Sequence, residues 1–466
     1  MSSVTVGVVG ACEAVPRRKG MKTTAKRVEV LETAVVAPSK ETPGQPLWLS
    51  NLDLAVPRTH TPLVYYYPAS AQAGAAAPGM GFLVLLERMK TALAMALVPF
   101  YPLAGRLSVG ADGRPQIDCN GQGALFVVAK ADLAGEEIFE HYEPSPEVRR
   151  TFVPSAPSNE APCPMAMFQV TFLKCGGVVL GTGIHHAVMD GVGAFQFIQT
   201  WSGLSRGLDV AEACGQLPFH DRSLLRARCP PCPTHDHFVY SRAFLSGRPR
   251  PFVTRVYSVS PDLLADLKSR CGSGASTYCV VTAHLWRCVC VARGFARGSD
   301  TRLGIPANIR SRVSPPLPRG FFGNAVVRDL VTARVGDVLD SSLGSVAAMV
   351  KEAVNHVDDA FVRSVVDYLE LEYGNGGGGG THAQASSEQL APASDLWAVS
   401  WLGMSMYDAD FGSGEPRFVA PAQMFGVGTA YMTPCADSED GIAVLFALEA
   451  EYMNSFEKAF YGKCQT

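Results

Sequence analysis

The spacing of apolar and polar residues along the chain follows two periods in turn, and their order predicts a mixed α/β fold. Short apolar runs rich in β-branched and aromatic residues are typical of strands, whereas apolar residues at helical spacing predict amphipathic helices. The first pattern predicts strands over residues 28–37, 63–67, 168–173, 178–184 and 252–259. The second pattern predicts helices over residues 81–98, 192–204, 261–269, 277–292 and 345–371.

A hairpin followed directly by a helix is the clearest local prediction. Gly176 and Gly177 lie between two predicted strands, which is a hairpin signal. After the second strand, one helix face carries apolar residues at every third position, namely Val192, Phe195, Ile198, Trp201 and Leu204. We interpret this stripe as core packing. Residues 185–191 therefore lie in a strand-to-helix turn, a kind of loop that often carries chemistry.

Breaks in these patterns divide the chain. A chain of 466 residues is longer than one hydrophobic core usually spans, so two lobes are expected. The predicted parts are an N-terminal extension over residues 1–26, an N-terminal lobe over 27–217, a crossover loop over 218–250 and a C-terminal lobe over 251–466. Met21 is a second plausible start beside Met1. Residues 374–394 are rich in glycine and polar residues, which predicts a disordered loop, because such chains behave as random coils. A phosphate-binding loop is not expected there, since it would follow a strand and precede a helix.

The composition excludes several classes of protein. The chain is 47% hydrophobic and 18% charged with a net charge of −3, which predicts a soluble globular protein without a nucleic-acid or membrane footprint. No run approaches the ~20 apolar residues that cross a bilayer. Thirteen cysteines, an odd number, and the lack of a secretory signal predict a reducing, cytoplasmic location. Cys229 and Cys232 have half the spacing of a zinc site without a second pair, so we predict no metal.

His186 and Asp190 are the first residues with clear chemical potential. They form an H-x-x-x-D pattern followed by Gly191, which permits backbone angles that other residues avoid. Histidine can take a proton near neutral pH, and a nearby carboxylate can orient the ring or anchor its loop. The pattern alone leaves a base and a structural histidine equally open. If His186 is a base, the chain is a transferase that activates an –OH or –NH nucleophile.

A second motif, residues 410–414, reads Asp-Phe-Gly-Ser-Gly near the C-terminus. Taken alone it predicts a turn, and the rest of a kinase signature is missing. Together with His186 and Asp190, however, it makes the chain resemble the plant BAHD acyl-CoA-dependent acyltransferases, in particular their hydroxycinnamoyltransferase branch. The resemblance runs from about residue 28 to the C-terminus. Further stretches of that branch's type are residues 47–54, 57–62, 100–107, 117–121, 221–222, 284–288 and 320–324.

The resemblance implies an α/β (α+β) fold of two similar lobes, of the chloramphenicol acetyltransferase type, with a channel between them. His186 would be the general base in mid-channel. It would deprotonate an acceptor that attacks the thioester of acyl-CoA, and a tetrahedral oxyanion would collapse to expel CoA. Acyl-CoA would be a co-substrate, with no permanently bound cofactor and no metal. The implied partners are small molecules only, and the implied state is a monomer.

The resemblance also implies roles for particular residues. Asp190 would be structural and paired with Arg310, because a buried carboxylate needs a partner. A loop away from the chemistry would be held by Asp410, Phe411, Gly412 and Gly414. The CoA contacts would be Ser276, Thr277, Tyr278 and Arg312. The acceptor pocket would be formed by His60, Leu63, Tyr65, Val399, Trp401 and Gly403.

The sequence departs from the family pattern at four positions. Ser413 replaces a tryptophan of the D-F-G-W-G motif, which removes an apolar surface and predicts reduced activity. Leu63, Val399 and Gly403 replace a serine, a threonine and an arginine that contact the acceptor in shikimate-type relatives. A carboxylate without its arginine is disfavoured in a closed site, so we predict that shikimate and quinate are poor acceptors. An amine such as putrescine or spermidine, or an alcohol, is predicted instead.

Three questions stay open at this level. The acyl group could be p-coumaroyl, caffeoyl, feruloyl, benzoyl or acetyl. A condensation domain of peptide synthetases shares the His-His-x-x-x-Asp-Gly pattern and the two lobes, although its other motifs are absent. An inactive relative that only binds CoA esters is the third alternative, indicated by Ser413 alone.

Overall fold

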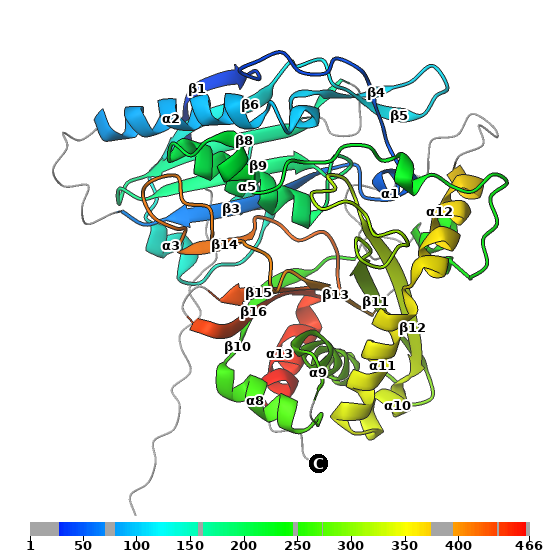
Figure 1. Ribbon diagram of the computed structural model, residues 1–466. Coiled ribbons are helices and arrows are strands. Elements are labelled where there is room, and N and C mark those ends of the chain that lie inside the picture. Colours follow the sequence, from blue (N-terminus) through cyan, green and yellow to red (C-terminus); the bar gives the residue numbers. More distant parts are fainter. Residues whose placement is uncertain are drawn as a thin grey trace, which may run out of the picture.

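The computed structural model of the protein describes residues 28–69, 80–156, 162–245, 250–272, 274–373, 395–435 and 438–462. Two six-stranded sheets dominate it, one in each lobe, and the lobes lie one above the other in Figure 1. This confirms the predicted two-lobed α/β architecture. The expected N-terminal extension and the expected disordered loop over residues 374–394 lie outside the described residues.

The first sheet carries the turn in which His186 lies. Its strand order is β1 (Val28–Val36), β6 (Ala124–Ala131), β8 (Ala166–Leu173), β9 (Val178–His185), β3 (His60–Tyr67) and β14 (Phe418–Pro421), and only β6 and β8 pair in parallel. Two helices, α2 (Met80–Ala96) and α5 (Gly191–Ser205), pack together beside this sheet. Trp201 of α5 is fully buried, with its ring centroid 4.8 Å from that of Phe168 on β8, and it donates a hydrogen bond to the carbonyl of Met89 on α2. The apolar stripe of α5 is therefore core, as expected.

The second sheet has the order β10 (Val253–Val259), β16 (Ser438–Leu448), β15 (Thr429–Cys435), β13 (Leu396–Ser400), β11 (Asp300–Asn308) and β12 (Val326–Arg334). The helices of this lobe lie below the sheet in Figure 1: α8 (Pro261–Ser269), α9 (Thr277–Ala292), α10 (Val335–Asp340), α11 (Leu343–His356) and α13 (Ala450–Tyr461). Ser260 and Ser276 cap α8 and α9 with their side chains, which explains why these two helices begin where the sequence predicts.

Short elements complete the molecule. A small sheet of β2 (Leu47–Trp48), β5 (Pro115–Asp118), β4 (Arg106–Val109) and β7 (Cys163–Pro164) lies in the first lobe. The short helices are α1 (Asn51–Leu54), α3 (Gly135–Phe139), α4 (Pro146–Phe152), α6 (Val210–Cys214) and α7 (Arg242–Leu245), with 3-10 turns at Tyr101–Ala104, Ser223–Leu225 and Phe238–Tyr240. The predicted crossover loop thus contains two 3-10 turns and α7. Within the described ranges no helix has the length and apolar character needed to cross a membrane.

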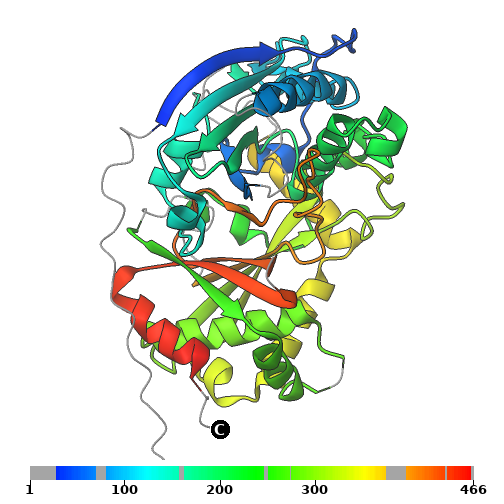
Figure 2. The ribbon, with the colours of Figure 1, turned by 90° about the vertical axis from the view of Figure 1, so that its left-hand side faces the viewer.

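The boundary predicted at residue 250 does not separate the two sheets. After β13 the chain leaves the second lobe and adds β14 to the edge of the first sheet, where Val419 pairs with Tyr65 and Pro421 with Leu63. This segment, orange in Figures 1 and 2, passes between the lobes. Phe411 lies within it and is buried in the first core. The physical reason is that β3 would otherwise expose an unpaired strand edge, a feature that folded proteins cover.

The single helix predicted over residues 345–371 is also wrong, because two helices, α11 and α12 (Asp359–Tyr373), occupy this region. Asp358 accepts a hydrogen bond from the backbone N–H of Phe361 at 2.8 Å and so caps the start of α12. Val357 ends α11 in a non-helical conformation. The apolar stripe continues across this break, since Val357 and Phe361 are both buried, and periodicity alone therefore did not reveal it.

Candidate active site

The predicted site residues lead to a cavity of about 590 Å³ that residues of both lobes line. From the first lobe the lining includes Thr61, Leu63, Thr182, Ile184 and His186, and from the second lobe Ala307, Asn308, Asn324, Val326 and Val399. The wall is mostly apolar, with a few polar side chains, as is usual for small-molecule sites. Because both sheets contribute, the shape of the cavity depends on how the lobes are held together.

His186 is half-buried on the wall of this cavity, directly after β9. Its backbone N–H donates to the carbonyl of Thr59 at 3.0 Å. Burial lowers the pKa of the ring below its usual value of 6.5, against the opposing effects of its own backbone carbonyl, the charge of Asp190 and the amide of Asn324. The ring is therefore neutral at pH 7 and can accept a proton. Since Nδ1 is buried, Nε2 is the nitrogen that can face a substrate.

Asp190 does not orient the imidazole but joins the two lobes. Arg310, from the end of β11, donates to both of its carboxylate oxygens at 2.7 and 3.0 Å. The same carboxylate caps α5 through the N–H of Gly193 and accepts from the N–H of Ala325. The bidentate pair is the one that the sequence analysis expected, and its two additional backbone partners leave the carboxylate fully engaged.

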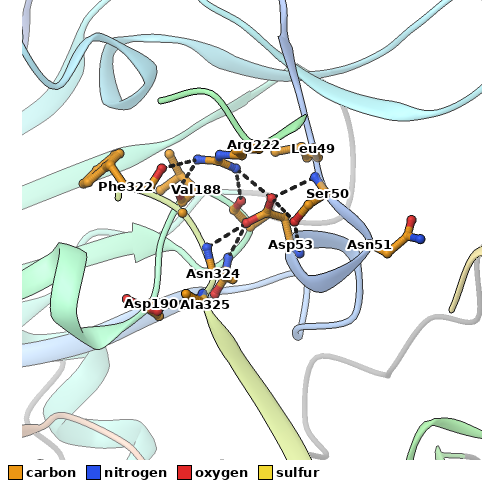
Figure 3. A network of polar contacts seen from close by, with 12 residues as sticks. Leu49, Ser50, Asn51, Asp53, Val188, Asp190, Arg222, Phe322, Asn324 and Ala325 are labelled. Carbon is orange, nitrogen blue, oxygen red and sulfur yellow. Dashed lines mark hydrogen bonds and ion pairs between the residues drawn. The ribbon is translucent and has the colours of Figure 1, made fainter. Parts of the chain in front are cut away.

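A second arginine–carboxylate pair lies behind the His186 loop. Arg222, from the crossover, and Asp53, from α1, form an ion pair at 3.1 Å with both side chains 0% exposed. Arg222 also donates to the carbonyls of Ala187 and Val188 at 3.2 and 2.6 Å and to that of Phe322 at 3.3 Å (Figure 3). The guanidinium thus binds two consecutive carbonyl groups of the turn that follows His186.

Asp53 and Asn324 extend this network to His186 itself. Asp53 accepts from the backbone N–H and the hydroxyl of Ser50, which forms the capping box of α1, and from the backbone and side-chain N–H groups of Asn324 at 2.9 Å (Figure 3). The side chain of Asn324 also donates to the carbonyl of His186 at 2.8 Å. The backbone of His186 is therefore fixed by groups from both lobes.

Asp53, Arg222 and Asn324 are site residues for which no role was predicted from the sequence. All three lie in stretches that carry the family resemblance, and Ser50 and Asp53 show the S-x-x-D spacing of a capping box. The spacing predicts a helix start, but no local pattern indicates that this carboxylate pairs with an arginine of the distant crossover. These contacts arise only when the lobes meet.

The Asp410 loop lies away from the cavity. Asp410 accepts hydrogen bonds from the backbone N–H groups of Gly412, Ser413 and Gly414 at 2.7, 3.1 and 2.9 Å, so it stabilises its own turn. Gly412 has a φ of 101°, which favours glycine. Phe411 packs 4.9 Å from Trp201 in the first core. Ser413 is exposed and does not line the cavity, so the geometry gives no reason for the reduced activity that its replacement of tryptophan predicts.

Four of the six predicted acceptor residues line the cavity: Leu63, Val399, Trp401 and Gly403. Gly403 has a φ of 76°, and a Cβ atom there would meet nothing within 4 Å, so open space remains where shikimate-type relatives carry an arginine. The other two do not line the cavity. His60 lies on the opposite face of β3 from Leu63 and bonds to the carbonyl of Pro164, as strand alternation requires. Tyr65 shares the face of Leu63 but lies deeper, fully buried in the core.

The predicted CoA residues are divided between two cavities. Tyr278 and Arg312 line the main cavity, where Tyr278 donates to the carbonyl of Ala398 and Arg312 to those of Val354 and Val357. Thr277 instead lines a neighbouring cavity of about 550 Å³, together with Lys268. Ser276 is engaged as the cap of α9 and lines neither. Leu402 and Gly403 line both cavities, so the two cavities are neighbours separated by these residues.

Metal chemistry has no preformed site in the part of the chain that the structure describes. There, no group of three or more histidine, cysteine or acidic side chains is arranged to hold a metal ion. The eleven described cysteines are free thiols, Cys229 and Cys232 included. The site instead offers one neutral imidazole on the wall of an apolar cavity, which is suited to general-base catalysis.

The chain is similar to known acyltransferases over nearly its whole length. The sequence profile of the Transferase family matches residues 26–463. The chain is 42% identical to putrescine hydroxycinnamoyltransferase 1 of Oryza sativa subsp. japonica, covering 93% of this chain and 98% of that protein. It is 38% identical to a hydroxycinnamoyl-CoA:5-hydroxyanthranilate N-hydroxycinnamoyltransferase of Avena sativa (92% and 98% covered) and 35% identical to shikimate O-hydroxycinnamoyltransferase of Nicotiana tabacum (93% and 99%).

Solved structures support the fold. Vinorine synthase superposes with a TM-score of 0.70 at 19% identity, covering 92% of this chain and 96% of that one. TRI101 of F. graminearum, solved with coenzyme A and T-2 mycotoxin, gives 0.68 at 16% identity (88% and 96%). A condensation domain of the calcium-dependent antibiotic synthetase gives 0.56 at 17% identity (89% and 95%).

Proposed function

The chain belongs to the Transferase family, the BAHD acyl-CoA-dependent acyltransferases, and on this premise we propose that it moves a hydroxycinnamoyl group from its CoA thioester to an amine. One observation carries the proposal. His186 is neutral at pH 7 and lies on the wall of a cavity that both lobes line. Two of the relatives reported above, at 42% and 38% identity, are named for transfer to putrescine and to the nitrogen of 5-hydroxyanthranilate, which supports an amine acceptor here.

The reaction follows from the position of the imidazole. Nε2 of His186 takes a proton from the acceptor while the acceptor nitrogen forms a bond to the thioester carbonyl carbon. The carbonyl oxygen gains negative charge in the tetrahedral intermediate and needs hydrogen-bond donors, a role that we assign to Thr61 and Trp401, two residues of the wall whose side chains can donate. When the carbon–sulfur bond breaks, the CoA thiolate leaves and takes the proton from the imidazolium.

We assign the CoA end to the neighbouring cavity that contains Lys268 and Thr277. Lys268 is exposed there and supplies a cation for phosphate oxygens. Leu402 and Gly403, which line both cavities, would then flank the pantetheine arm on its way to His186. Arg312 is less suited to phosphate, because two backbone carbonyls already occupy its guanidinium.

A polyamine such as putrescine is the acceptor we favour. The open space at Gly403 removes the arginine that would hold a shikimate or quinate carboxylate. The nucleophile must be a neutral amine, and a mostly apolar cavity disfavours its protonated form. A hydroxyl acceptor is the second candidate, favoured by the 35% identity to a shikimate O-hydroxycinnamoyltransferase.

The test compares His186→Ala with wild type in transfer from p-coumaroyl-CoA to putrescine, spermidine, an alcohol and shikimate, with products read by mass. We expect turnover to fall about 10²–10⁴-fold while the affinity for p-coumaroyl-CoA changes little. His141→Ala, an exposed histidine outside the cavity, serves as the matched control and should retain full activity.

Two results would overturn the proposal. If wild type and His186→Ala are equally inert but both bind p-coumaroyl-CoA, the protein is a CoA-ester-binding protein. If shikimate turns over faster than every amine and alcohol, the acceptor assignment is wrong.

We further propose that the enzyme acts as a cytoplasmic monomer. The described cysteines are all free, which is usual in a reducing compartment. Size-exclusion chromatography with light scattering tests the monomer, and imaging of a fluorescent fusion tests the location.

A further inference from the structure

An arginine lines the main cavity at a distance from the reacting centre. Asn324, Val326 and Arg328 all line the cavity, as expected for alternate residues on one face of β12 and the stretch before it. At roughly 3.3 Å of rise per residue, the backbone of Arg328 lies about 13 Å from that of Asn324, which bonds to His186. Arg328 is thus about the length of one small molecule away from the residues around His186.

The guanidinium of Arg328 lies over an aromatic ring. Its Cζ lies 4.5 Å from the ring centroid of Tyr240, a residue of the crossover that also lines the cavity. The hydroxyl of Tyr240 accepts a hydrogen bond from the backbone N–H of Arg328 at 2.6 Å. One Nη of the guanidinium donates to the carbonyl of Ala55 at 3.2 Å. Stacking and these hydrogen bonds limit the rotation of the guanidinium and leave further N–H groups for a ligand.

The charge balance of the cavity leaves this arginine without an acidic partner. Among the described lining residues Asp190 is the single carboxylate, and it is engaged by Arg310. Arg328 forms no ion pair with any described residue, whereas Arg312 has the helix-terminal carbonyls of Val354 and Val357. A guanidinium in a mostly apolar cavity binds an electron-rich oxygen more strongly than it would in water.

We propose that Arg328, stacked on Tyr240, is a specificity-determining residue that binds an oxygen carried by the substrate far from the reacting carbon. The inference rests on the proposed function and adds the chemistry of one substrate end. Two groups present the required oxygen: the ring hydroxyl of the hydroxycinnamoyl group, or a carboxylate on an aromatic amine acceptor. A polyamine offers no such oxygen, so with putrescine the acyl group is the source.

The test uses Arg328→Gln and Arg328→Lys. Glutamine keeps one N–H donor group but loses the positive charge and the paired N–H groups of the guanidinium. Lysine keeps the charge but loses the planar group that stacks on the ring. Arg334→Gln is the matched control, because Arg334 lies on the same strand, is 61% exposed and pairs with Asp300 outside the cavity. Thermal unfolding of all variants separates a folding defect from a change in selectivity.

Two ratios of kcat/KM distinguish the sources of the oxygen. One compares p-coumaroyl-CoA with cinnamoyl-CoA, which lacks the ring hydroxyl, using putrescine as acceptor. The other compares 5-hydroxyanthranilate with putrescine, using p-coumaroyl-CoA. We expect Arg328→Gln to lower one of the two ratios by about tenfold to a hundredfold, the range for a lost charge-assisted hydrogen bond. Arg328→Lys should lower it less, and Arg334→Gln should leave both unchanged.

A purely structural role would reduce all three rates by the same factor and leave both ratios unchanged, and this result would overturn the proposal. Equilibrium binding of p-coumaroyl-CoA and cinnamoyl-CoA without acceptor distinguishes failure of the proposed function from failure of the Arg328 subsite. If wild type binds neither thioester, the proposed function fails. If it binds and transfers both equally well, and neither ratio responds to Arg328→Gln, the proposed function stands and the Arg328 subsite fails.

Discussion

Two arginine–carboxylate pairs hold the loop that carries His186, and they differ in burial and in what they join. Asp53 and Arg222 are both 0% exposed, and their pair fixes the backbone after His186 through carbonyl groups. Asp190 is 4% exposed and Arg310 16%, and their pair joins the end of β11 to the start of α5. The Asp53–Arg222 pair stabilises the loop that carries His186, whereas the Asp190–Arg310 pair fixes the position of one lobe relative to the other.

The difference in burial determines what the loss of each pair costs. A fully buried charge that loses its partner has no water to solvate it. Removing one member of the Asp53–Arg222 pair therefore lowers the free energy of unfolding by the uncompensated cost of burying the other charge. Arg310 keeps the carbonyls of Phe321 and Gly323 and some contact with water when its carboxylate is lost. The inner pair should therefore matter mainly for folding, and the outer pair for the alignment of the two lobes.

Arg222→Met should have the largest effect on stability. It leaves Asp53 buried without its cation and frees the carbonyls of Ala187 and Val188, so we expect a loss of about 3–5 kcal/mol in the free energy of unfolding. Urea unfolding measures it. Arg226→Met is the control, since the exposed Arg226 only stacks on Trp48 and should cost less than about 1 kcal/mol. Equal losses in the two variants would contradict the assigned role of the inner pair.

Asp190→Asn should have the next largest effect. The amide keeps the shape but removes the charge that Arg310 binds at 2.7 Å, so we expect a loss of about 1.5–3 kcal/mol together with a lower kcat/KM. Asp209→Asn is the control, because Asp209 caps α6 without an arginine partner and asparagine caps about equally well. If both variants behave like wild type, the lobes are not aligned by this pair.

Asp410 gives a third comparison, a carboxylate whose nearest partners are backbone N–H groups of its own loop. Asp410→Ala removes the acceptor for Gly412, Ser413 and Gly414 and should cost about 1 kcal/mol, whereas Asp410→Asn should cost less because one oxygen remains. Neither variant should change KM, because the loop does not line the cavity. A large change in KM would place this loop in substrate binding.

The pH dependence of the rate should show the smallest effect. Burial lowers the pKa of His186 below 6.5, so the base stays neutral as the pH falls to that value, and the rate drops only in more acidic solution. The charge of Asp190 raises this pKa, so Asp190→Asn should move the midpoint of the acid limb to lower pH. Asp209→Asn should leave it in place. A shift to higher pH in Asp190→Asn would contradict the electrostatic argument.

The sequence predicts the features that depend on local order. The turn that holds His186 follows from a hairpin signal and an apolar helix stripe, and α9 follows from its apolar residues at helical spacing. The family resemblance supplies Arg310 as the partner of Asp190. The rest depends on contacts between distant segments. The pairing of Asp53 with Arg222 forms only when α1 and the crossover meet, and the strand alternation that turns His60 away from the cavity becomes visible only once β3 is paired.

The path of the chain between β13 and β15 has a consequence for how substrates come and go. Because β14 belongs to the sheet of the first lobe, the chain passes from the second lobe to the first after β13 and returns before β15. The lobes are therefore joined by two more chain segments besides the crossover. A wide separation of the two lobes would break the pairing of β14 with β3. We therefore expect substrates to enter and products to leave through small movements of side chains and loops at the openings of the cavity, while the distance between the lobes stays constant.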